Sequence, residues 1–524
     1  MPDAQLTARS LETLLGEWRG NGAHYQALAD RIRLLVLDGR VPIDTRLPAE
    51  RDLAGRLELS RTTVTAAYRE LRDAGFVDSI RGSGSVTRLP GPVLVQGAPI
   101  GGDGMLDFTK AALPAATALP AAARAAAEEL PHFLPSSGYD PVGLPHLREA
   151  IAERYRSRGL PTDPEEILVT VGAQQAIALI ARTFLGRGDR ALIEMPTYPH
   201  ATESLRLAGA RLVPITVTPP GSAGPAGPAG PAGPAGPHPV VGSGAAGGSG
   251  EADGWDIEAI EQTIQRANPA LAYLIPDFHN PTGASMSPET RARVVAAAAA
   301  QGTIVVGDET TGDLDIDRMG EFPSIASFRT RRAGDAPLLL IGSASKSLWG
   351  GLRIGWIRAD RSVVRKLIAA KPSTDLGTPM IEQLVVARML PDFPAIMEER
   401  RVQLRSGRDT VRRMLAETFP DWIVPDLHGG LAAWVGIGAP VSSALALGAR
   451  NHGLLLAAGP RFGLDGAFER FLRIPITYSE EETGRAVAAL ARAWAGSLRG
   501  PVPYADPVAL ADVVRPESAE AVRS

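Results

Sequence analysis

The sequence predicts a multidomain chain in which a small helical module precedes a larger α/β domain. At 524 residues the chain is too long for one ordinary domain, and 44% of its residues are hydrophobic, which is enough to bury large cores. Residues 21–88 carry dense helical periodicity, whereas short apolar runs alternate with helical stretches over 106–500. That alternation is typical of an α/β domain with a mainly parallel sheet.

Composition and charge exclude several classes of protein. The formal net charge of -4 provides no global attraction to nucleic acid or to a membrane, so any DNA contact must come from a local patch. The absence of cysteine excludes disulfides and thiolate metal sites, and we expect no metal. No apolar run nears the roughly 18 residues of a membrane helix, and the N-terminus lacks a signal-peptide pattern. We therefore expect a cytoplasmic protein without a membrane partner.

Proline and glycine set the remaining boundaries. We expect an N-terminal tail over 1–20, a linker over 89–105 and a C-terminal tail over 501–524. A flexible linker of about 16 residues spans roughly 20 to 25 Å, which keeps the front module close to the larger domain. Residues 219–254 form a Gly/Pro/Ala insertion that is too short for a collagen-like triple helix and predicts a disordered surface loop.

The front module has the element order of a winged helix-turn-helix. HYQALADRIRLLVLDGR is amphipathic and predicts a first helix, and PAERDLAGRLEL predicts a second. Ser60 can cap a third helix, SRTTVTAAYRELRDAG, that Gly75 stops. FVDSIRGSGSVTR then gives two short strands around a Gly-Ser-Gly turn, which is a wing.

The third helix opens with Arg61, Thr62 and Thr63, at the end that enters a major groove in such folds. Charge alone does not establish DNA binding, because residues 46–88 hold eight arginines against six acids. A small helical interaction domain is the alternative on pattern alone.

The stretch LPAERDLAGRLELSRTTVTAAYRELRDAGFVDSIRGSGSV resembles the winged helix-turn-helix of the GntR family of bacterial repressors. The partner that this resemblance implies is a double-stranded DNA operator. The DNA-binding residues that it implies are Arg51, Ser60, Arg61, Thr62, Thr63, Arg81 and Gly82.

In the larger domain, GSASKSLWGGLRIGW frames one lysine in a chain that holds only four, at 110, 346, 366 and 371. A lysine that forms a Schiff base with an aldehyde cofactor must be partly deprotonated, so it needs desolvation or a nearby cation. Ser343 and Arg353 can hold a phosphate dianion, the arginine bidentately. Taken alone, a lysine beside a glycine turn is usually a surface residue.

Three upstream motifs add candidate residues. VTVGAQQAIALIARTFL places Ala173 and Gln174 at a strand-to-helix junction, where free backbone N–H groups bind anions. Tyr198 in EMPTYPHA can stack on a flat heterocycle, although a packed core tyrosine is the commoner case. Asn280 in PDFHNPTG can donate to a phenolate oxygen, although NPTG is also a common turn.

Two further residues lie in apolar runs that predict buried strands. Asp308 ends TIVVGDE, where a carboxylate can pair with a protonated pyridine nitrogen or simply cap a helix. Arg473 lies within FLRIPI, where an unpaired guanidinium would be costly, so it should meet a carboxylate from protein or ligand.

The order and spacing of these motifs resemble the fold-type I aminotransferases, which bind pyridoxal 5'-phosphate (PLP) and carry a smaller C-terminal α/β subdomain. The resemblance implies a Schiff base between PLP and Lys346, and a substrate or effector carboxylate at Arg473. Tyr139 in GYDPVGLPHLREAI matches a residue that reaches the phosphate bound by the partner subunit, which implies a homodimer. The other cofactor contacts that it implies are Ala173, Gln174, Ser343 and Arg353 at the phosphate, Tyr198 on the ring, Asn280 at the ring oxygen and Asp308 at the pyridine nitrogen.

A GntR-type head before an aminotransferase-like domain resembles the MocR subfamily of transcriptional regulators. The resulting hypothesis is a PLP-dependent regulator that senses an amine, an amino acid or PLP itself and controls operator binding. Two alternatives stay open: an active PLP-dependent aminotransferase with a DNA-binding appendage, and a DNA-binding protein whose second domain only dimerises. Thr310 and Thr311 stand where many relatives carry a tyrosine, which argues mildly against the enzyme.

Overall fold

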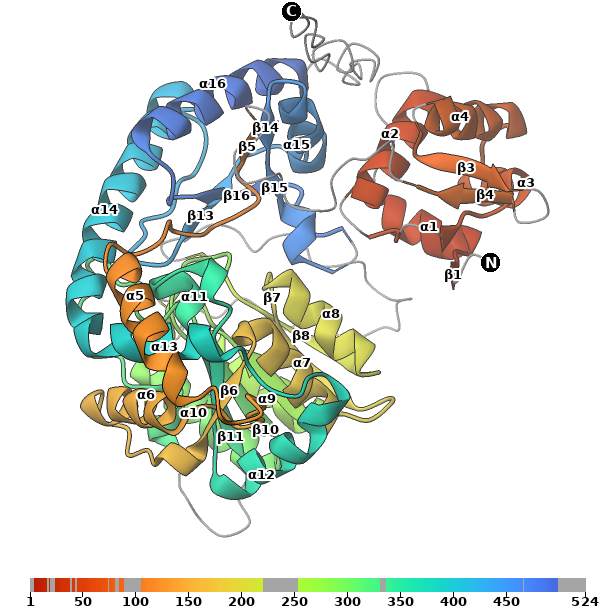
Figure 1. The fold of residues 1–524 in the computed structure, drawn as a ribbon. Helices are drawn as coiled ribbons and strands as arrows, with labels where there is room; N and C mark the ends of the chain where they lie inside the picture. Colours follow the sequence, from red (N-terminus) through yellow and green to blue (C-terminus); the bar gives the residue numbers. More distant parts are fainter. Residues whose placement is uncertain are drawn as a thin grey trace, which may run out of the picture.

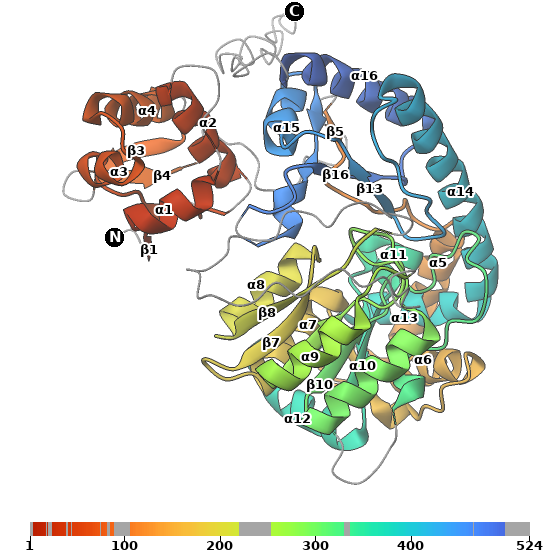
Figure 2. The ribbon, with the colours of Figure 1, turned by 180° about the vertical axis from the view of Figure 1, so that it is seen from behind.

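The structure is a computed structural model, and it describes residues 4–16, 18, 24–37, 40–42, 45–73, 75–80, 84–88, 105–219, 253–329, 336–464 and 466–497. A small N-terminal domain lies beside the C-terminal part of a much larger domain (Figures 1 and 2). Nearly all of the predicted linker over 89–105, most of the insertion over 219–254 and the whole tail over 501–524 fall outside the described residues.

The N-terminal domain has the predicted three helices and two wing strands. They are α2 (His24–Leu37), α3 (Glu50–Leu57), α4 (Arg61–Asp73), β3 (Val77–Ile80) and β4 (Gly84–Thr87). The third helix packs through the apolar positions that its periodicity predicts. The buried side chains of α4 are Val64, Ala67, Tyr68 and Leu71.

The domain begins earlier than its sequence pattern indicates. A two-residue strand, β1 (Ala4–Gln5), and α1 (Ala8–Leu15) belong to it, with Leu11 and Leu15 fully buried. The predicted tail over 1–20 is therefore wrong for these elements. A helix of eight residues gains its stability from tertiary packing, which the local pattern does not reveal.

The larger domain is built on a seven-stranded sheet in the order β6-β12-β11-β10-β9-β7-β8. All pairings are parallel except those of β12, which runs antiparallel to both of its neighbours. This confirms the mainly parallel sheet. The strands are β6 (Ile167–Thr170), β7 (Arg190–Met195), β8 (Arg211–Thr216), β9 (Leu271–Leu274), β10 (Ile304–Asp308), β11 (Leu338–Ser343) and β12 (Gly355–Arg358).

Helices cover both faces of this sheet, so its central strands are apolar on both sides. One face packs against α7 (Gly172–Phe184), α8 (Pro199–Leu207) and α12 (Arg361–Ala370). The helices on the other face are α5 (Leu119–Glu129), α6 (Pro145–Ser157), α9 (Ile257–Ala267), α10 (Pro288–Gln301) and α13 (Met380–Met389). No helix in the described part of the chain is long and apolar enough to span a bilayer.

A smaller C-terminal subdomain follows the long helix α14 (Phe393–Thr418), as predicted. Its three-stranded sheet has the order β13-β16-β15, and a separate two-stranded sheet pairs β14 with β5 from the start of the larger domain. The chain therefore enters the larger domain through this subdomain. The elements are β5 (Leu106–Asp107), β13 (Ala432–Gly436), α15 (Ser442–Arg450), β14 (Leu454–Leu455), β15 (Ala457–Ala458), β16 (Phe471–Pro475) and α16 (Glu480–Ser497).

The residues that flank the Gly/Pro/Ala insertion lie side by side. The Thr218 N–H donates to the Gly254 carbonyl at 2.9 Å, and Val217 forms a bridge with Trp255. Trp255 is fully buried, and its Nε1 donates to Glu194 on β7 at 3.0 Å. The insertion therefore leaves and rejoins the fold at one point without separating the strands.

Candidate functional site

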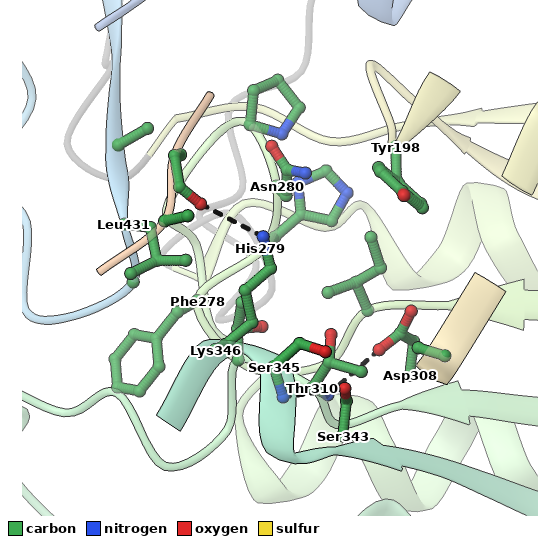
Figure 3. Close-up of a pocket in the computed structure, with 18 of the residues that line it drawn as sticks. Tyr198, Phe278, His279, Asn280, Asp308, Thr310, Ser343, Ser345, Lys346 and Leu431 are labelled. Atoms are coloured by element: carbon green, nitrogen blue, oxygen red, sulfur yellow. Dashed lines mark hydrogen bonds between the residues drawn. The ribbon is translucent and has the colours of Figure 1, made fainter. Parts of the chain in front are cut away.

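A cavity of about 300 Å³ lies at the carboxyl ends of the parallel strands, where open α/β sheets place their ligands. Residues that come directly after β6, β7, β9, β10 and β11 line one side, and the C-terminal subdomain closes the other. Figure 3 shows Lys346, Asp308, Tyr198 and Asn280 around this space. The predicted residues that it brings together are Ala173, Gln174, Tyr198, Asn280, Asp308, Ser343, Lys346, Arg353 and Arg473.

Lys346 lies in α11 (Ala344–Ser347), directly after β11, and its Nζ donates to the Ala111 carbonyl at 3.1 Å. The pKa of the amine is lowered to about 8, chiefly by burial; the Arg473 and Arg353 cations contribute to this lowering, and Asp308 opposes it. A neutral amine is the nucleophile that captures an aldehyde. The pocket therefore makes this lysine a nucleophile close to neutral pH.

One end of the pocket is a cup with free backbone N–H groups, formed where β6 meets α7. Gly172 opens the helix at φ +74°, and a Cβ there would lie 2.6 Å from the Arg353 guanidinium. A Cβ on Gly355 would lie 2.6 Å from the Gly172 carbonyl carbon. Only glycine lets the arginine and the helix start approach this closely, and together they fit an anion.

The hydroxyls at this end complete the cup. Ser343 Oγ donates to the Ile354 carbonyl at 3.2 Å and accepts from the Ser345 N–H at 3.1 Å. Ser345 Oγ is buried and, among the described residues, has no partner. Because an unpaired buried hydroxyl is costly, a phosphate oxygen would satisfy it. The sequence predictions missed Ser345, whose signal was its position directly before the lysine.

The side chain of Gln174 has a role that the sequence does not indicate. Its side-chain amide donates to Ser204 Oγ at 2.9 Å and to the His200 carbonyl at 3.3 Å, both on α8. Only its backbone N–H remains for an anion at the start of α7. The side chain instead fixes α8, which begins directly after Tyr198.

The carboxylate of Asp308 lines the middle of the pocket, and this residue is only 4% exposed. Its Oδ1 accepts from the Thr310 N–H at 3.0 Å, and its Oδ2 accepts from the Tyr273 hydroxyl at 2.5 Å. Burial raises the pKa of Asp308, while these two hydrogen bonds and the Lys346 charge oppose the rise. Burial also raises the pKa of Tyr198 to about 12, so this ring stays neutral and suits stacking.

The guanidinium of Arg473 lies at the end of the pocket that faces the C-terminal subdomain. Arg473 on β16 donates to Asn280 Oδ1 at 3.4 Å and to the Thr109 carbonyl. No ion pair joins it to a carboxylate in the described ranges, and its Nε lacks a partner there. Burial, with Arg461 nearby, lowers its pKa to about 10, so it remains a cation at neutral pH. The site therefore suits a ligand carboxylate.

The predicted DNA-reading residues of the head lie at the start of α3, which carries Arg51, and at the start of α4. Arg51, Arg61 and Thr62 are exposed and Thr63 is half-buried. Ser60 Oγ accepts from the Thr63 N–H at 3.1 Å, which confirms it as the helix cap. The predicted wing contacts Arg81 and Gly82 lie outside the described residues.

Tyr139 is 71% exposed and lies outside the pocket of its own chain. Its contact with the phosphate bound by a partner subunit, and the homodimer that this contact implies, stay predictions.

Head and pocket together define a class of protein in which a helix-turn-helix domain precedes an aminotransferase fold. The family described as aminotransferase class I and II matches residues 106–232 and 237–490, and the chain belongs to it. The family described as bacterial regulatory proteins, gntR family, matches residues 24–86. This order of domains is that of MocR-type transcriptional regulators.

Relatives of both kinds are similar to this chain. A 2-aminoadipate transaminase of Thermus thermophilus is 30% identical over 370 residues, which are 70% of this chain and 82% of that protein. YdfD of Bacillus subtilis, an uncharacterized HTH-type transcriptional regulator, is 24% identical across 87% of this chain and 93% of its own length. The probable rhizopine catabolism regulatory protein MocR of Rhizobium meliloti is 29% identical across 64% of each chain.

Among solved structures, the α-aminoadipate aminotransferase LysN of Thermus thermophilus superposes with a TM-score of 0.62 and 27% identity. The match covers 76% of this chain and 94% of that one, which was crystallised with N-(5'-phosphopyridoxyl)-L-leucine. A kynurenine aminotransferase of Pyrococcus horikoshii, at 22% identity and a TM-score of 0.62, shares the fold. The family and this complex imply PLP as the cofactor.

The lowered pKa of Lys346 predicts its reactivity toward an amine-specific acylating reagent. Because only the neutral amine reacts, labelling should rise through a midpoint near pH 8, against 10.5 for an ordinary lysine. Arg473→Met removes a cation and should raise the midpoint, whereas Arg461→Met should leave it unchanged. Mass spectrometry of the peptide that contains Lys346 gives the midpoint, and a value near that of ordinary lysine would contradict the described pocket.

The exposed face of the head predicts which arginines contact DNA. Arg51→Ala should weaken binding to all sequences and reduce the salt dependence of the affinity by about one phosphate contact. Arg56→Ala is the matched control, because Arg56 lies on the same helix but pairs with Glu12 of α1 at 2.6 Å. Fluorescence anisotropy at several salt concentrations measures both slopes. Equal losses in the two variants would place the DNA face elsewhere.

Proposed function

We propose that this protein is a PLP-dependent transcription regulator in which the pocket senses an amine, an amino acid or PLP itself and thereby controls operator binding. The observation that carries the proposal is the position of β16. This strand places Arg473 in the pocket, and the turn directly before it places Glu469 against the DNA-binding head.

The residues of the pocket fit PLP from end to end. When bound, PLP would supply an aldehyde carbon that captures amines and a ring that accepts electrons. The start of α7, with the serines and Arg353, would hold its phosphate, and Tyr198 would cover its ring. Lys346 would offer its neutral amine to the aldehyde, and Asp308 would hold a proton on the pyridine nitrogen. An effector carboxylate would bind Arg473.

A mostly buried ion pair connects the head to the C-terminal subdomain. Arg31 on α2 donates to Glu469 Oε1 at 2.6 Å, and the two side chains are only 13% and 16% exposed. Arg31 Nε also donates to the Leu15 carbonyl at the end of α1, at 2.9 Å. The other Glu469 oxygen accepts from the Ser443 N–H at 2.9 Å, at the start of α15. The ion pair therefore joins α1 and α2 of the head to the start of α15.

This contact gives the effector a physical route to the head. Glu469 and Arg473 lie four residues apart, so a shift of β16 on carboxylate binding would move both ends of the connection. A ligand changes such an equilibrium only by its differential affinity for the two states, and a tenfold change in DNA affinity requires about 1.4 kcal/mol. In a homodimer, the two heads would then be set at the spacing of two operator half-sites.

An active aminotransferase with a DNA-binding appendage is the second candidate. The observation that favours it is the pocket itself, in which a lysine of lowered pKa faces a buried aspartate. Conversion of an amino acid and a 2-oxo acid at about one turnover per second or faster would support it. Slow turnover together with effector-dependent DNA binding would support the regulator.

Spectroscopy and DNA binding on one preparation test the proposal. PLP-loaded protein should show a visible absorption band that Lys346→Ala abolishes. Amino acids should change both the band and the affinity for DNA upstream of its own gene, the affinity by about five-fold or more. The Arg473→Met variant should need a higher amino-acid concentration for the same response. Its response to an amine that lacks a carboxylate should equal that of the wild-type protein. DNA affinity that is indifferent to PLP and to every amine would contradict the regulator.

Glu469→Gln should separate sensing from DNA binding. The variant loses the charge that pairs with Arg31 but keeps Arg473 and the pocket, so the absorption band and its response to amino acids should stay. The amino acid should change the free energy of DNA binding in this variant by less than half as much as it does in the wild-type protein. Glu480→Gln is the matched control, because Glu480 pairs with Arg413 at an exposed position of the same subdomain. A wild-type response of DNA affinity to the amino acid in Glu469→Gln would refute a connection through the Arg31–Glu469 ion pair.

A further inference from the structure

Tyr273 is a fully enclosed tyrosine in the centre of the sheet. It lies on β9 directly opposite Val306 of β10, two residues before the end of that strand at Asp308. Its side chain is 1% exposed, and it is absent from the residues that line the cavity. Tyr273 therefore cannot touch a ligand in the pocket directly, and any effect on a ligand must pass through Asp308.

The two donors to Asp308 occupy different oxygens. The Tyr273 hydroxyl donates to Oδ2 at 2.5 Å, and the Thr310 N–H donates to Oδ1 at 3.0 Å. Burial and the adjacent carboxylate raise the pKa of Tyr273 well above its ordinary value, so the hydroxyl keeps its proton. A buried carboxylate stays ionised only when donors or cations offset its desolvation. The tyrosine is one of the two residues whose hydrogen bonds oppose the effect of desolvation on Asp308.

We propose that Tyr273 is a positioning residue for the cofactor: its hydroxyl keeps Asp308 ionised and oriented, and so determines whether the pyridine nitrogen of PLP carries a proton. This role rests on PLP occupying the pocket, as proposed above. Without the hydroxyl, desolvation would raise the proton affinity of Asp308, and a protonated carboxyl would no longer stabilise a pyridinium. The proton would then be held by Asp308 or lost from the ring.

Three other ionisable side chains act on Tyr273 or Asp308. Lys346 after β11 lowers the pKa of Asp308, whereas Tyr198 after β7 and Glu194 on β7 act on Tyr273. Removal of the Tyr273 hydroxyl leaves all three in place. The effect on the cofactor can therefore be assigned to the lost donor.

The test is the protonation of bound cofactor in the full chain. Wild-type protein and Tyr273→Phe are loaded with PLP that carries an isotopic label at the pyridine nitrogen, and the NMR shift of that nitrogen is followed against pH. Wild-type protein should hold a pyridinium. In Tyr273→Phe the apparent pKa of the pyridinium should fall by about one unit or more, since a hydrogen bond to a charged group is worth about that much.

Tyr155→Phe is the matched control. Tyr155 is also buried in the larger domain, and its hydroxyl accepts from Trp356 Nε1 at 3.0 Å, with no hydrogen bond to Asp308. Its removal should cost stability in the same way but leave the nitrogen shift unchanged. Incorporation of a ring-fluorinated tyrosine at position 273 keeps the side chain and strengthens the donor, so it should move the pKa in the opposite direction.

Three results would overturn the role of Tyr273. One is an unchanged nitrogen pKa in Tyr273→Phe that still binds PLP, and another is an equal shift in Tyr155→Phe. Should Tyr273→Phe fail to fold, an unchanged pKa in the fluorinated protein would decide against the role. Wild-type protein that binds no PLP would refute the cofactor proposal itself, which separates that failure from a failure of Tyr273 alone.

Discussion

Desolvation of one lysine is the constraint on which the rest of the larger domain depends. Lys346 must be buried to lose its proton near neutral pH, yet the same burial would make a fully apolar pocket hostile to a charged ligand. The fold resolves this by placing charged groups around the amine. Arg473 and Arg353 lower its pKa from two ends of the cavity, and Asp308 supplies the balancing negative charge. Asp308 ends β10, Arg473 lies within β16 and Arg353 comes two residues before β12, so the two sheets fix their separation.

Sensing and DNA binding meet in the C-terminal subdomain. The strand that carries Arg473 is preceded by the turn that carries Glu469, and this carboxylate reaches α2 of the head through Arg31. A surface ion pair between two domains would contribute little, but this pair is mostly buried and also bonds the start of α15. In this account the pocket influences the head through a short, packed connection rather than through the linker.

Much of this arrangement could be predicted from sequence because its signals are local. The inward face of α4 follows from helical periodicity, and most of the pocket residues follow from motifs at or after the carboxyl ends of strands in one mainly parallel sheet. The features that were missed depend on distant contacts. The helix α1 is too short to be predicted without its packing partners, and Tyr273 reads as an ordinary core residue until β9 and β10 bring it to Asp308, 35 positions away. The hydrogen bond from the Gln174 side chain to Ser204 of α8 likewise joins residues 30 positions apart, so no local motif indicates it.

Thermodynamic linkage provides the most direct measurement of the central claim, that the pocket controls the head. If an amino acid changes the affinity for DNA by some factor, DNA must change the affinity for that amino acid by the same factor. The PLP-loaded protein should therefore be titrated with the amino acid, with the visible band as readout, in the presence and absence of saturating operator DNA. The account predicts two binding curves displaced by the factor seen in DNA binding. Superimposable curves would contradict it and would leave the pocket and the DNA-binding head energetically independent.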